Sequence, residues 1–397
     1  MIKSEIIEKF TRYFAAGCKP QQKIGVEIEH FVVKKDTHES VSYYGKRGVQ
    51  AILERLKPYY TEGIYEAGQL LGLVGPQAVI TLEPGSQLEI SMVSCETVEE
   101  AERIYTDFLQ QMTPILEEYS YELLTQGYLP KSTPQEIELI PKKRYEFMDD
   151  YFKKTGTSGI HMMRGTASTQ VSVDYASEAD FVKKYRVANL LIPFLYLLTE
   201  NARRYTLPGK GAHIGRAQIW QDVDQAREGV LPGVFDEGFG FEAYARAICD
   251  VPAIFIPHEG EYLYTKSRPI GELAQTYGLG EEEIAHYLSM VFYDIRLKQY
   301  IEIRPADSMP LVYDLAYAAL IKTIFYHSEL LSLLSERWSV TVPAITEALE
   351  SIMRRGYDAV VYGQNIYESM QYLLQLVYRA CPTDERKYLL PFISLVE

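Results

Sequence analysis

Two glutamates that share one face of a predicted β-strand constrain this chain more than any other feature. Residues 24–33 read IGVEIEHFVV, and β-branched and aromatic residues dominate them, which is typical of a strand. Side chains two residues apart in a strand point to the same face, so Glu27 and Glu29 project side by side. Neighbouring carboxylates raise each other's pKa unless a cation or a shared proton relieves their repulsion. The pair therefore predicts a cation-binding site on a sheet.

The charge balance favours an enzyme that acts on small molecules. The 397 residues include 40 Lys and Arg and 54 Asp and Glu, for a formal net charge of −14. Such a surface repels nucleic acid and anionic membranes, and no apolar run reaches the roughly 18 residues that a transmembrane helix needs. The four cysteines are widely spaced, so we expect neither a zinc site nor a disulfide framework. Without a signal peptide in the N-terminal residues, we expect a cytoplasmic monomer or homodimer.

Periodic segments elsewhere predict helices and further strands in one continuous domain. Residues 80–91 read as a β-hairpin with Pro84, Gly85 and Ser86 at its turn, and residues 169–175 and 299–305 read as strands. We expect a loop over 203–240 and helices over residues 4–16, 47–56, 97–119, 145–154, 177–201 and after Pro310. Since no repeat or linker is visible, we expect a single α+β domain over residues 1–397, with a helical C-terminal part over about 311–397.

Two further predicted strand segments carry the same kind of side chain as the first. The hairpin contributes Glu83 and Glu89, and the segment 299–305 contributes Glu302. Carboxylate oxygens suit magnesium, which bridges phosphate oxygens in phosphoryl transfer. Because side chains alternate along a strand, Glu83 and Glu89 share a face only if the hairpin loop has an odd number of residues or a bulge. Two plainer interpretations stay open: carboxylates on a solvated sheet face, and a surface ion pair between Glu302 and Arg304.

Ordered motifs extend well beyond these glutamates, over about residues 20–320. They are 24–29 (IGVEIE), 82–91 (LEPGSQLEIS), 161–174 (HMMRGTASTQVSVD), 177–180 (SEAD), 215–224 (GRAQIWQDVD), 229–232 (GVLP), 235–244 (FDEGFGFEAY) and 296–307 (RLKQYIEIRPAD). With these motifs the chain resembles the glutamate–cysteine ligase family of the plant and proteobacterial type, which also includes the actinobacterial enzymes that begin ergothioneine synthesis.

The resemblance implies both a fold and a reaction. The implied fold is glutamine-synthetase-like, a curved antiparallel sheet with helices on its outer face and with metals and substrates on its concave face. The implied reaction joins the γ-carboxylate of L-glutamate to the amine of L-cysteine, a step of glutathione biosynthesis that uses ATP and two or three Mg²⁺ ions. Phosphorylation by ATP turns a carboxylate oxygen into a good leaving group, and the amine then attacks the γ-glutamyl phosphate.

The resemblance also implies roles for individual residues. Glu29 and Arg304 match catalytic positions, with Arg304 placed to meet phosphate. An arginine such as Arg216 suits an amino-acid carboxylate because its planar fork binds two oxygens at once. Trp220 can wall the pocket, although core packing is equally compatible with a lone tryptophan. The implied metal ligands are Glu27, Glu29, Glu83, Glu89 and Glu302, and the implied substrate-binding residues are Arg164, Arg216, Gln170, Trp220 and Arg296.

The chain departs from the family pattern at a few positions. Gly165 stands where the family has a substrate-binding arginine, and Arg164 precedes it; in a strand, this one-residue shift reverses the face of the side chain. Other departures lie at 217–218 (AQ), Pro305 and 308–309 (SM), which we place around the amine acceptor. Two alternatives to cysteine ligation therefore stay open: a γ-glutamyl ligase for a different amine, and a non-catalytic relative that binds an amino acid or a nucleotide.

Overall fold

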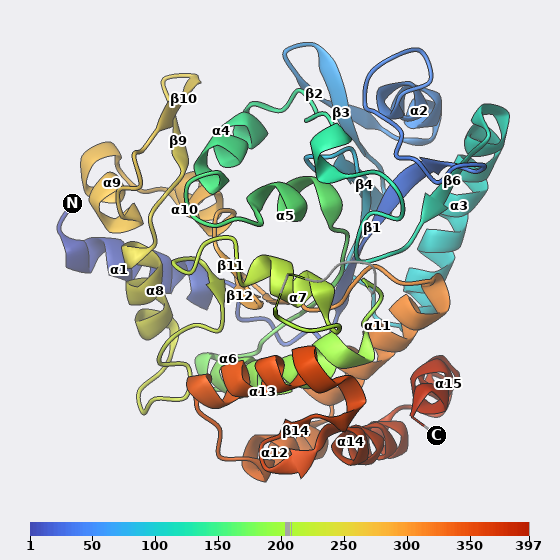
Figure 1. The fold of residues 1–397 in the computed structure, drawn as a ribbon. Helices are drawn as coiled ribbons and strands as arrows, with labels where there is room; N and C mark the ends of the chain where they lie inside the picture. The colour runs from blue at the N-terminus through green and yellow to red at the C-terminus, as the bar shows by residue number, and fades with distance from the viewer. Residues whose placement is uncertain (203–206, 208, 397) are drawn as a thin grey trace.

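A nine-stranded antiparallel sheet runs through the middle of the molecule (Figure 1). The computed structural model describes residues 1–202, 207 and 209–396. Within this range the strand order is β12-β13-β7-β1-β5-β4-β3-β2, and β6 pairs with the far end of β1. The strands are β1 (Ile24–Lys34), β2 (Glu62–Glu66), β3 (Gln69–Val74), β4 (Ala78–Leu82), β5 (Leu88–Met92), β6 (Tyr121–Leu124), β7 (Thr169–Val173), β12 (Ile295–Leu297) and β13 (Ile301–Ile303).

The glutamate-bearing strand β1 lies at the centre of the sheet, as its apolar alternation requires. Ile24, Val26 and Ile28 are almost completely buried on one face. The opposite face carries Glu27, which pairs with Gln170 of β7, and Glu29, which lies directly across from Glu89 of β5. Like charges in directly opposed positions destabilise a sheet. This polar face is therefore maintained for something other than stability.

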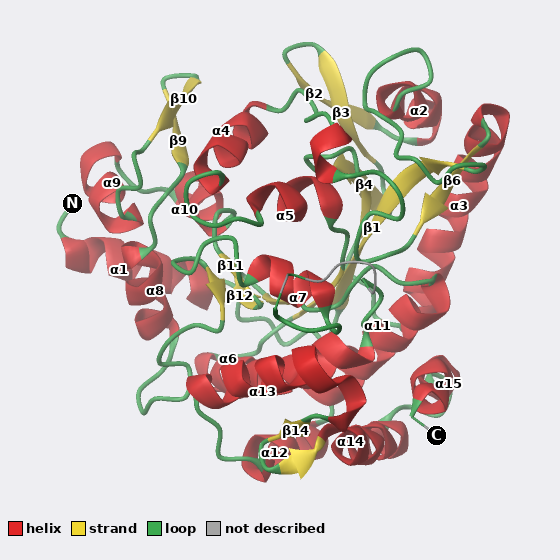
Figure 2. Ribbon diagram, in the orientation of Figure 1, coloured by secondary structure: helices red, strands yellow, loops and turns green. Residues whose placement is uncertain are grey.

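Long helices cover the apolar face of the sheet (Figure 2). Helix α3 (Val98–Tyr119) packs against β5 and β6, α11 (Leu311–Tyr326) against β1 and β7, and α6 (Glu178–Leu198) against β12 and β13. The apolar side chains of α11 are buried almost all round the helix, as expected for a helix between a sheet and other helices. The α+β fold with helices on the outer face of an antiparallel sheet is confirmed.

Shorter helices lie over the polar face of the sheet. They are α4 (Lys143–Phe152), α5 (Gly159–Gly165) and α7 (Gly215–Trp220). The loop of the β4–β5 hairpin fixes α5 in place, because Gln87 Nε2 donates to the carbonyl oxygen of Thr166 at 2.8 Å. Leu82 pairs with Leu88, so the loop has an odd number of residues and Glu83 and Glu89 share one face. The condition set by the sequence is met.

The remaining elements surround this core. The other helices are α1 (Lys3–Ala15), α2 (Val49–Leu56), α8 (Phe241–Asp250), α9 (Ile270–Tyr277), α10 (Glu281–Leu288), α12 (Ser328–Arg337), α13 (Val342–Arg355), α14 (Ile366–Ala380) and α15 (Arg386–Leu395). Three small sheets pair β8 (Glu228–Gly229) with β11 (Phe292–Tyr293), β9 (Phe255–His258) with β10 (Glu261–Tyr264), and β14 (Val360–Val361) with β15 (Gln364–Asn365). Beyond Leu311 the regular secondary structure of the described chain is helical apart from the β14–β15 pair.

Two segments differ from expectation. Met162, Met163 and Arg164 lie in the short helix α5, whereas we considered a strand there. The loop predicted over 203–240 contains α7 and β8; residues 203–206 and 208 of that loop lie outside the described residues. All four cysteines are free thiols. In the part of the chain that the structure describes, no helix combines the length and apolar character needed to cross a membrane.

Candidate active site

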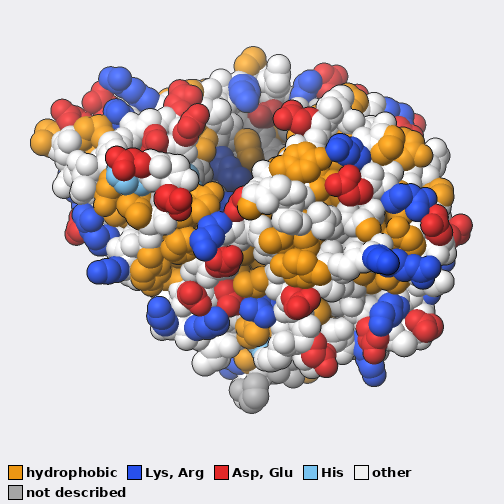
Figure 3. Space-filling model, turned by 90° about the horizontal axis from the view of Figure 1, so that it is seen from above, with side chains coloured by type: hydrophobic (Ala, Val, Ile, Leu, Met, Phe, Trp, Pro, Cys, Tyr) orange, Lys and Arg blue, Asp and Glu red, His pale blue; other side chains and the backbone are white. Residues whose placement is uncertain are grey.

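A cavity of about 300 Å³ lies between the polar face of the sheet and helices α4, α5 and α7. The face seen in Figure 3 is hollowed, and basic side chains lie deep in the hollow. Eleven ionisable Glu, Lys and Arg side chains line the cavity. They are Glu27, Glu29, Glu83, Glu89, Glu302, Lys142, Arg144, Arg216, Arg296, Lys298 and Arg304, and the other lining residues include Gln170, Trp220, Tyr145, Met162, Met163 and Ser168.

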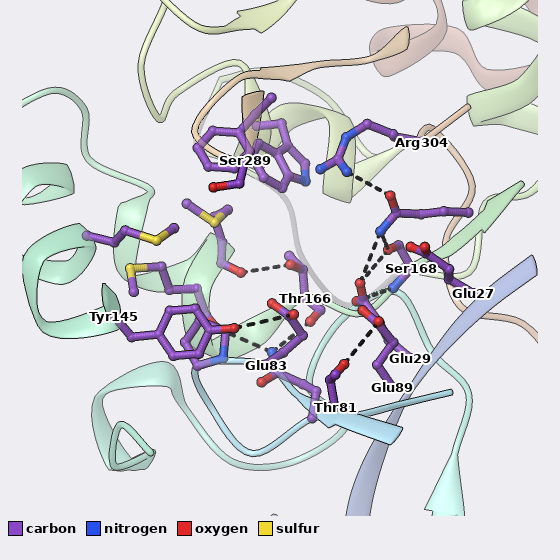
Figure 4. A pocket seen from close by; sticks show the side chains of 18 of the residues that line it. Glu27, Glu29, Thr81, Glu83, Glu89, Tyr145, Thr166, Ser168, Ser289 and Arg304 are labelled. Atoms are coloured by element: carbon purple, nitrogen blue, oxygen red, sulfur yellow. Dashed lines mark hydrogen bonds between the residues drawn. The ribbon is translucent and has the colours of Figure 1, made fainter. Parts of the chain in front are cut away.

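Four of the carboxylates gather on β1, β5 and the β4–β5 hairpin. Figure 4 shows Glu29 and Glu89 close together, with Glu83 beside them and Arg304 farther off. Glu29 accepts hydrogen bonds from the backbone nitrogen of Ser168 at 2.7 Å and from its hydroxyl at 2.8 Å. Glu89 accepts from Thr81 Oγ1 at 3.0 Å and from Ser91 Oγ at 2.6 Å. These bonds hold the two carboxylates in place although they repel each other.

Burial and mutual repulsion make ionisation of these carboxyls unfavourable. Burial, followed by the charges of Glu83 and Glu89, raises the pKa of Glu29 to about 8. Burial, followed by the charges of Glu89 and Glu302, raises the pKa of Glu27 in the same way. The pKa of Glu83 is raised by burial and by Glu89. A bound cation would reverse these shifts, because it favours the charged form of each carboxyl.

The fifth carboxylate, Glu302, lies in a different electrostatic setting. It is fully buried, and it accepts from Arg296 Nε at 2.6 Å, from Lys298 Nζ at 2.7 Å and from Arg304 Nη1 at 3.3 Å. Although burial acts in the opposite direction, these three cations hold the pKa of Glu302 far below its ordinary value. The plainer interpretation of a surface ion pair between Glu302 and Arg304 is wrong about its location: the two side chains form an ion pair, but it is buried in the cavity wall.

Arg304 connects this basic cluster to the acidic one. Its Nη1 donates to Gln170 Oε1 at 2.7 Å, and Gln170 Nε2 lies 3.4 Å from Glu29 Oε1. The Arg304 guanidinium lies 5.8 Å from the ring centroid of Trp220, within the range of a cation–π contact. The orientation of Arg304 is therefore fixed before any ligand binds.

Two buried donors next to Arg304 lack acceptors. Arg216 Nη1 donates to the backbone oxygens of Arg304 and Pro305, both at 3.1 Å. Arg216 Nε and Trp220 Nε1 have no hydrogen-bond partner among the described residues. A buried donor left unpaired is costly, so both nitrogens are suited to receive an acceptor from a ligand. Trp220 also packs against Phe292 with ring centroids 5.5 Å apart, so it is both a wall and a packing residue.

The oxygen donors suit a hard cation, although they are not arranged as a finished metal site. Within the described residues, no group of three or more His, Cys, Asp or Glu is close enough to hold an ion. Among the described residues, the ion pairs of the cavity wall all involve Glu302, and Glu27, Glu29, Glu83 and Glu89 form none. Unpaired carboxylates of this kind fit magnesium, which keeps part of its water shell and takes few protein ligands.

The structure does not bring Arg164 into the cavity. Its Nη1 donates to the backbone oxygen of Ile137 at 2.9 Å, and its Nη2 lies 2.6 Å from Asp149 Oδ1. Arg164 thus ties α5 to α4, and both helices line the cavity through other residues. The departures at Gly165, 217–218, Pro305 and 308–309 are likewise absent from the cavity lining.

Sequence reasoning overlooked several lining residues. Lys142, Arg144 and Tyr145 reach the cavity from the start of α4, and Lys298 reaches it from the β12–β13 turn. One signal was available for the first group: a short basic run directly before a helix, in a protein of net negative charge. Lys298 lies between Arg296 and Glu302 in the same motif. The β12–β13 turn brings its ammonium to the Glu302 carboxylate.

Comparisons with known proteins identify the family of this chain. A profile of glutamate–cysteine ligase family 2 matches residues 23–365. Chloroplastic glutamate–cysteine ligase B of Oryza sativa subsp. japonica is 32% identical over 344 residues, covering 84% of this chain and 68% of that protein. The chloroplastic enzyme of Arabidopsis thaliana is 33% identical over 313 residues, covering 76% and 59%.

A solved structure has a similar fold at low sequence identity. It is a Francisella tularensis glutamate–cysteine ligase in complex with AMP, 10% identical, with a TM-score of 0.54 over 94% of this chain and 81% of that chain. This match supports the fold. The chain spans between 59% and 69% of the lengths of the plant relatives. On the profile match and the plant relatives, the chain belongs to glutamate–cysteine ligase family 2.

Proposed function

We propose that this protein uses ATP and Mg²⁺ to join the γ-carboxylate of L-glutamate to the amine of L-cysteine. The observation that carries the proposal is one cavity in which four carboxylates without ion pairs lie beside a cluster of oriented cations. An anionic nucleotide and an anionic amino acid both need such cations in a protein of charge −14. The names of the plant relatives supply the substrates.

The reaction has two steps that this cavity suits. The γ-carboxylate oxygen of glutamate attacks the terminal phosphorus of ATP, which releases ADP and forms γ-glutamyl phosphate. The amine of cysteine then attacks the acyl carbon, phosphate leaves, and the amine loses a proton. Bound magnesium would screen the negative charge of the triphosphate. No protein nucleophile is required.

The carboxylates on the acidic side are assigned to magnesium. Glu27, Glu29, Glu83 and Glu89 supply enough oxygens for two ions, since magnesium uses one or two carboxylates and completes its shell with water and phosphate. A third ion would need Glu302 to give up contacts with Arg296, Lys298 and Arg304. We therefore favour two ions over three.

The residues on the basic side are assigned to the substrates. Arg304 is anchored by Glu302 and Gln170, so it can stabilise developing phosphate charge without reorganising. Arg216 and Trp220 carry the unpaired donors described above, and we assign them to the substrate carboxylate. We assign Arg296 a positioning role, because its Nε donates a hydrogen bond to Glu302.

An ADP-release assay with a panel of amines tests the assignment of the acceptor. With glutamate, ATP and magnesium fixed, cysteine should stimulate ADP release more than other amino acids or simple amines, and mass spectrometry should detect γ-glutamylcysteine. Equal stimulation by all amines would contradict cysteine as the acceptor. The absence of any glutamate-dependent ADP release would contradict ligase activity itself.

The wider setting of the reaction is also a proposal. We propose that residues 1–397 act as one catalytic unit, because one continuous hydrophobic core contains side chains from Ile6 to Val396. A role in glutathione biosynthesis follows from the proposed product. A cytoplasmic location and a monomeric or homodimeric state stay predictions from the sequence; the plant relatives are described as chloroplastic.

A further inference from the structure

Two buried serines from distant segments bond to the same glutamate, and we propose that both position Glu29 to bind a metal ion. Ser168 lies directly before β7, and Ser308 lies after β13. Their exposed fractions are 2% and 0%. The inference rests on the proposed function, which assigns Glu29 to magnesium, and it identifies the residues that hold this carboxylate in place before the ion binds.

Ser168 bonds to the Glu29 carboxylate at both oxygens (Figure 4). Its backbone nitrogen donates to Oε2 at 2.7 Å, and its hydroxyl donates to Oε1 at 2.8 Å. A carboxylate has about four lone-pair positions. The two bonds therefore hold both oxygens in place and leave lone pairs that a cation can use.

The direction of the Ser168 hydroxyl is set by a chain of hydrogen bonds from the basic side of the cavity. Arg304 can only donate, and its Nη1 lies 2.7 Å from Gln170 Oε1. The amide nitrogen of Gln170 is therefore the end that faces Ser168 Oγ, at 3.3 Å. Because Ser168 Oγ accepts from this amide, its single proton goes to Glu29. The chain ends on Glu29 as an acceptor, which is the form that binds a metal ion.

Ser308 holds the backbone of the same residue. The Glu29 nitrogen donates to the backbone oxygen of Ser168 at 3.0 Å, and the Glu29 carbonyl oxygen accepts from Ser308 Oγ at 2.6 Å. Both backbone groups thus point away from β5, where Glu89 lies directly opposite. Opposed residues of an antiparallel pair that share no backbone bonds approach each other most closely. The two serines therefore keep Glu29 close to Glu89 although their charges repel.

The position of Ser308 explains why a side chain is needed there. The pairing of β1 with β7 ends at Ile28 and Thr169, so the next residue, Glu29, lies where this ladder stops. A buried carbonyl without a donor is costly, and the Ser308 hydroxyl supplies the donor. Ser308 does not line the cavity, and position 308 is one of the departures from the family pattern. The motifs in the sequence therefore gave no reason to expect its contact with Glu29.

Titration calorimetry with Mn²⁺, which prefers the same oxygen ligands as magnesium, tests the proposal without requiring turnover. Ser168→Ala and Ser308→Ala should each weaken Mn²⁺ binding by about tenfold or more, because each variant loses a group that orients a metal ligand. In thermal unfolding, Mg²⁺ together with AMP-PNP, a non-hydrolysable analogue of ATP, should stabilise both variants less than wild type. KM for glutamate should stay within about twofold.

Two control variants separate positioning from a general loss of stability. Thr199 is 1% exposed, and its Oγ1 donates to the backbone oxygen of Leu195 at 2.7 Å, outside the cavity lining. Thr199→Val removes this buried bond, so it should lower the melting temperature and leave Mn²⁺ affinity unchanged. Ser172 lies on the face of β7 that carries Gln170, and no described residue bonds to its hydroxyl. Ser172→Ala should change neither quantity.

A double-mutant comparison asks whether the serines act through Glu29. In a Glu29→Gln background, Ser168→Ala and Ser308→Ala should change the residual Mn²⁺ affinity by less than about twofold, because the carboxylate that they position is already gone. Serines that acted independently of Glu29 would weaken binding by the same factor in both backgrounds.

Four results would overturn the proposal. They are unchanged Mn²⁺ affinity in both serine variants, an equal loss of affinity in Thr199→Val, a full effect of the serine substitutions in the Glu29→Gln background, and a wild-type protein that does not bind Mn²⁺. A wild-type protein that binds Mn²⁺ but forms no amide would contradict the proposed ligation, while the affinities of the variants would still decide the role of the two serines.

Discussion

Replacing Glu29 with Gln tests whether the carboxylate cluster is a cation site. Glu29 is 8% exposed, lies opposite Glu89, and accepts two hydrogen bonds from Ser168. Glutamine keeps the shape of the side chain and one acceptor oxygen, and the Ser168 hydroxyl can rotate to accept from the new amide. The substitution therefore removes a negative charge with little loss of packing.

The structure predicts both the sign and the size of the effect on stability. Because the pKa of Glu29 rises from 4.5 to about 8 on folding, the folded state binds more protons than the unfolded state between these values. The free energy of unfolding of the metal-free protein then falls as pH increases from 4.5 to 8. Each pKa unit corresponds to about 1.4 kcal/mol, so the fall due to Glu29 by pH 7.5 is at most about 4 kcal/mol.

Urea unfolding of both proteins at pH 5 and pH 7.5, without divalent ions, measures this effect. The Glu29→Gln variant should be more stable than wild type at pH 7.5 and should show a flatter pH dependence. Magnesium with AMP-PNP should stabilise wild type more than the variant. Ligase turnover should fall by about a hundredfold or more, since a charge that holds the metal is lost.

Glu62→Gln provides the matched control, because Glu62 is exposed on the edge strand β2 of the same sheet. It should change neither turnover nor the pH dependence of stability. Identical pH slopes for Glu29→Gln and wild type would refute the electrostatic reasoning, and unchanged turnover in Glu29→Gln would remove Glu29 from the active site.

Three further outcomes follow from the same contacts. Arg164→Met should lower the melting temperature, because it breaks the link between α5 and Asp149. It should leave KM for glutamate within about twofold, and a tenfold rise in that KM would show that Arg164 binds the substrate. Arg227 is fully buried against Asp224, so Arg227→Met should reduce the free energy of unfolding in urea by about 3–5 kcal/mol, and a loss below about 1 kcal/mol would contradict that pairing. EDTA should abolish ADP release and added magnesium should restore it; full activity in EDTA would contradict the metal assignment.

Local patterns in the sequence are sufficient to predict the strands that carry the carboxylates. The alternation around Glu27 and Glu29 identifies both the strand and its polar face, because a strand repeats every two residues. The sequence places Glu83 and Glu89 on one face only if the hairpin loop is odd or bulged, and the pairing of Leu82 with Leu88 in the structure supplies the odd loop. The ordered motifs add β7 and β13, and with them Gln170 and Glu302.

Contacts between distant segments account for what the sequence did not reveal. The helix α5 is short and begins and ends in glycine, Gly159 and Gly165, so its local propensity is weak. Its conformation depends on Gln87 of the hairpin loop and on the bond from Arg164 to Asp149. The direction in which Arg164 points follows from those contacts, and no pattern within the motif specifies it. The placement of Lys142 in the cavity lining likewise depends on the position of α4 over the sheet.

The position of the departures from the family pattern bears on the choice of acceptor. We placed these departures around the amine site on sequence grounds, which left cysteine the weakest part of the assignment. In the structure, Gln218 is fully buried, and its amide donates to the backbone oxygens of Gly211 and His213. Ser308 Oγ donates to the backbone oxygen of Glu29 at 2.6 Å. Both residues support the cavity wall from behind, so a different amine acceptor would have to be selected by other residues that line the cavity, such as Met162, Met163 and Phe292.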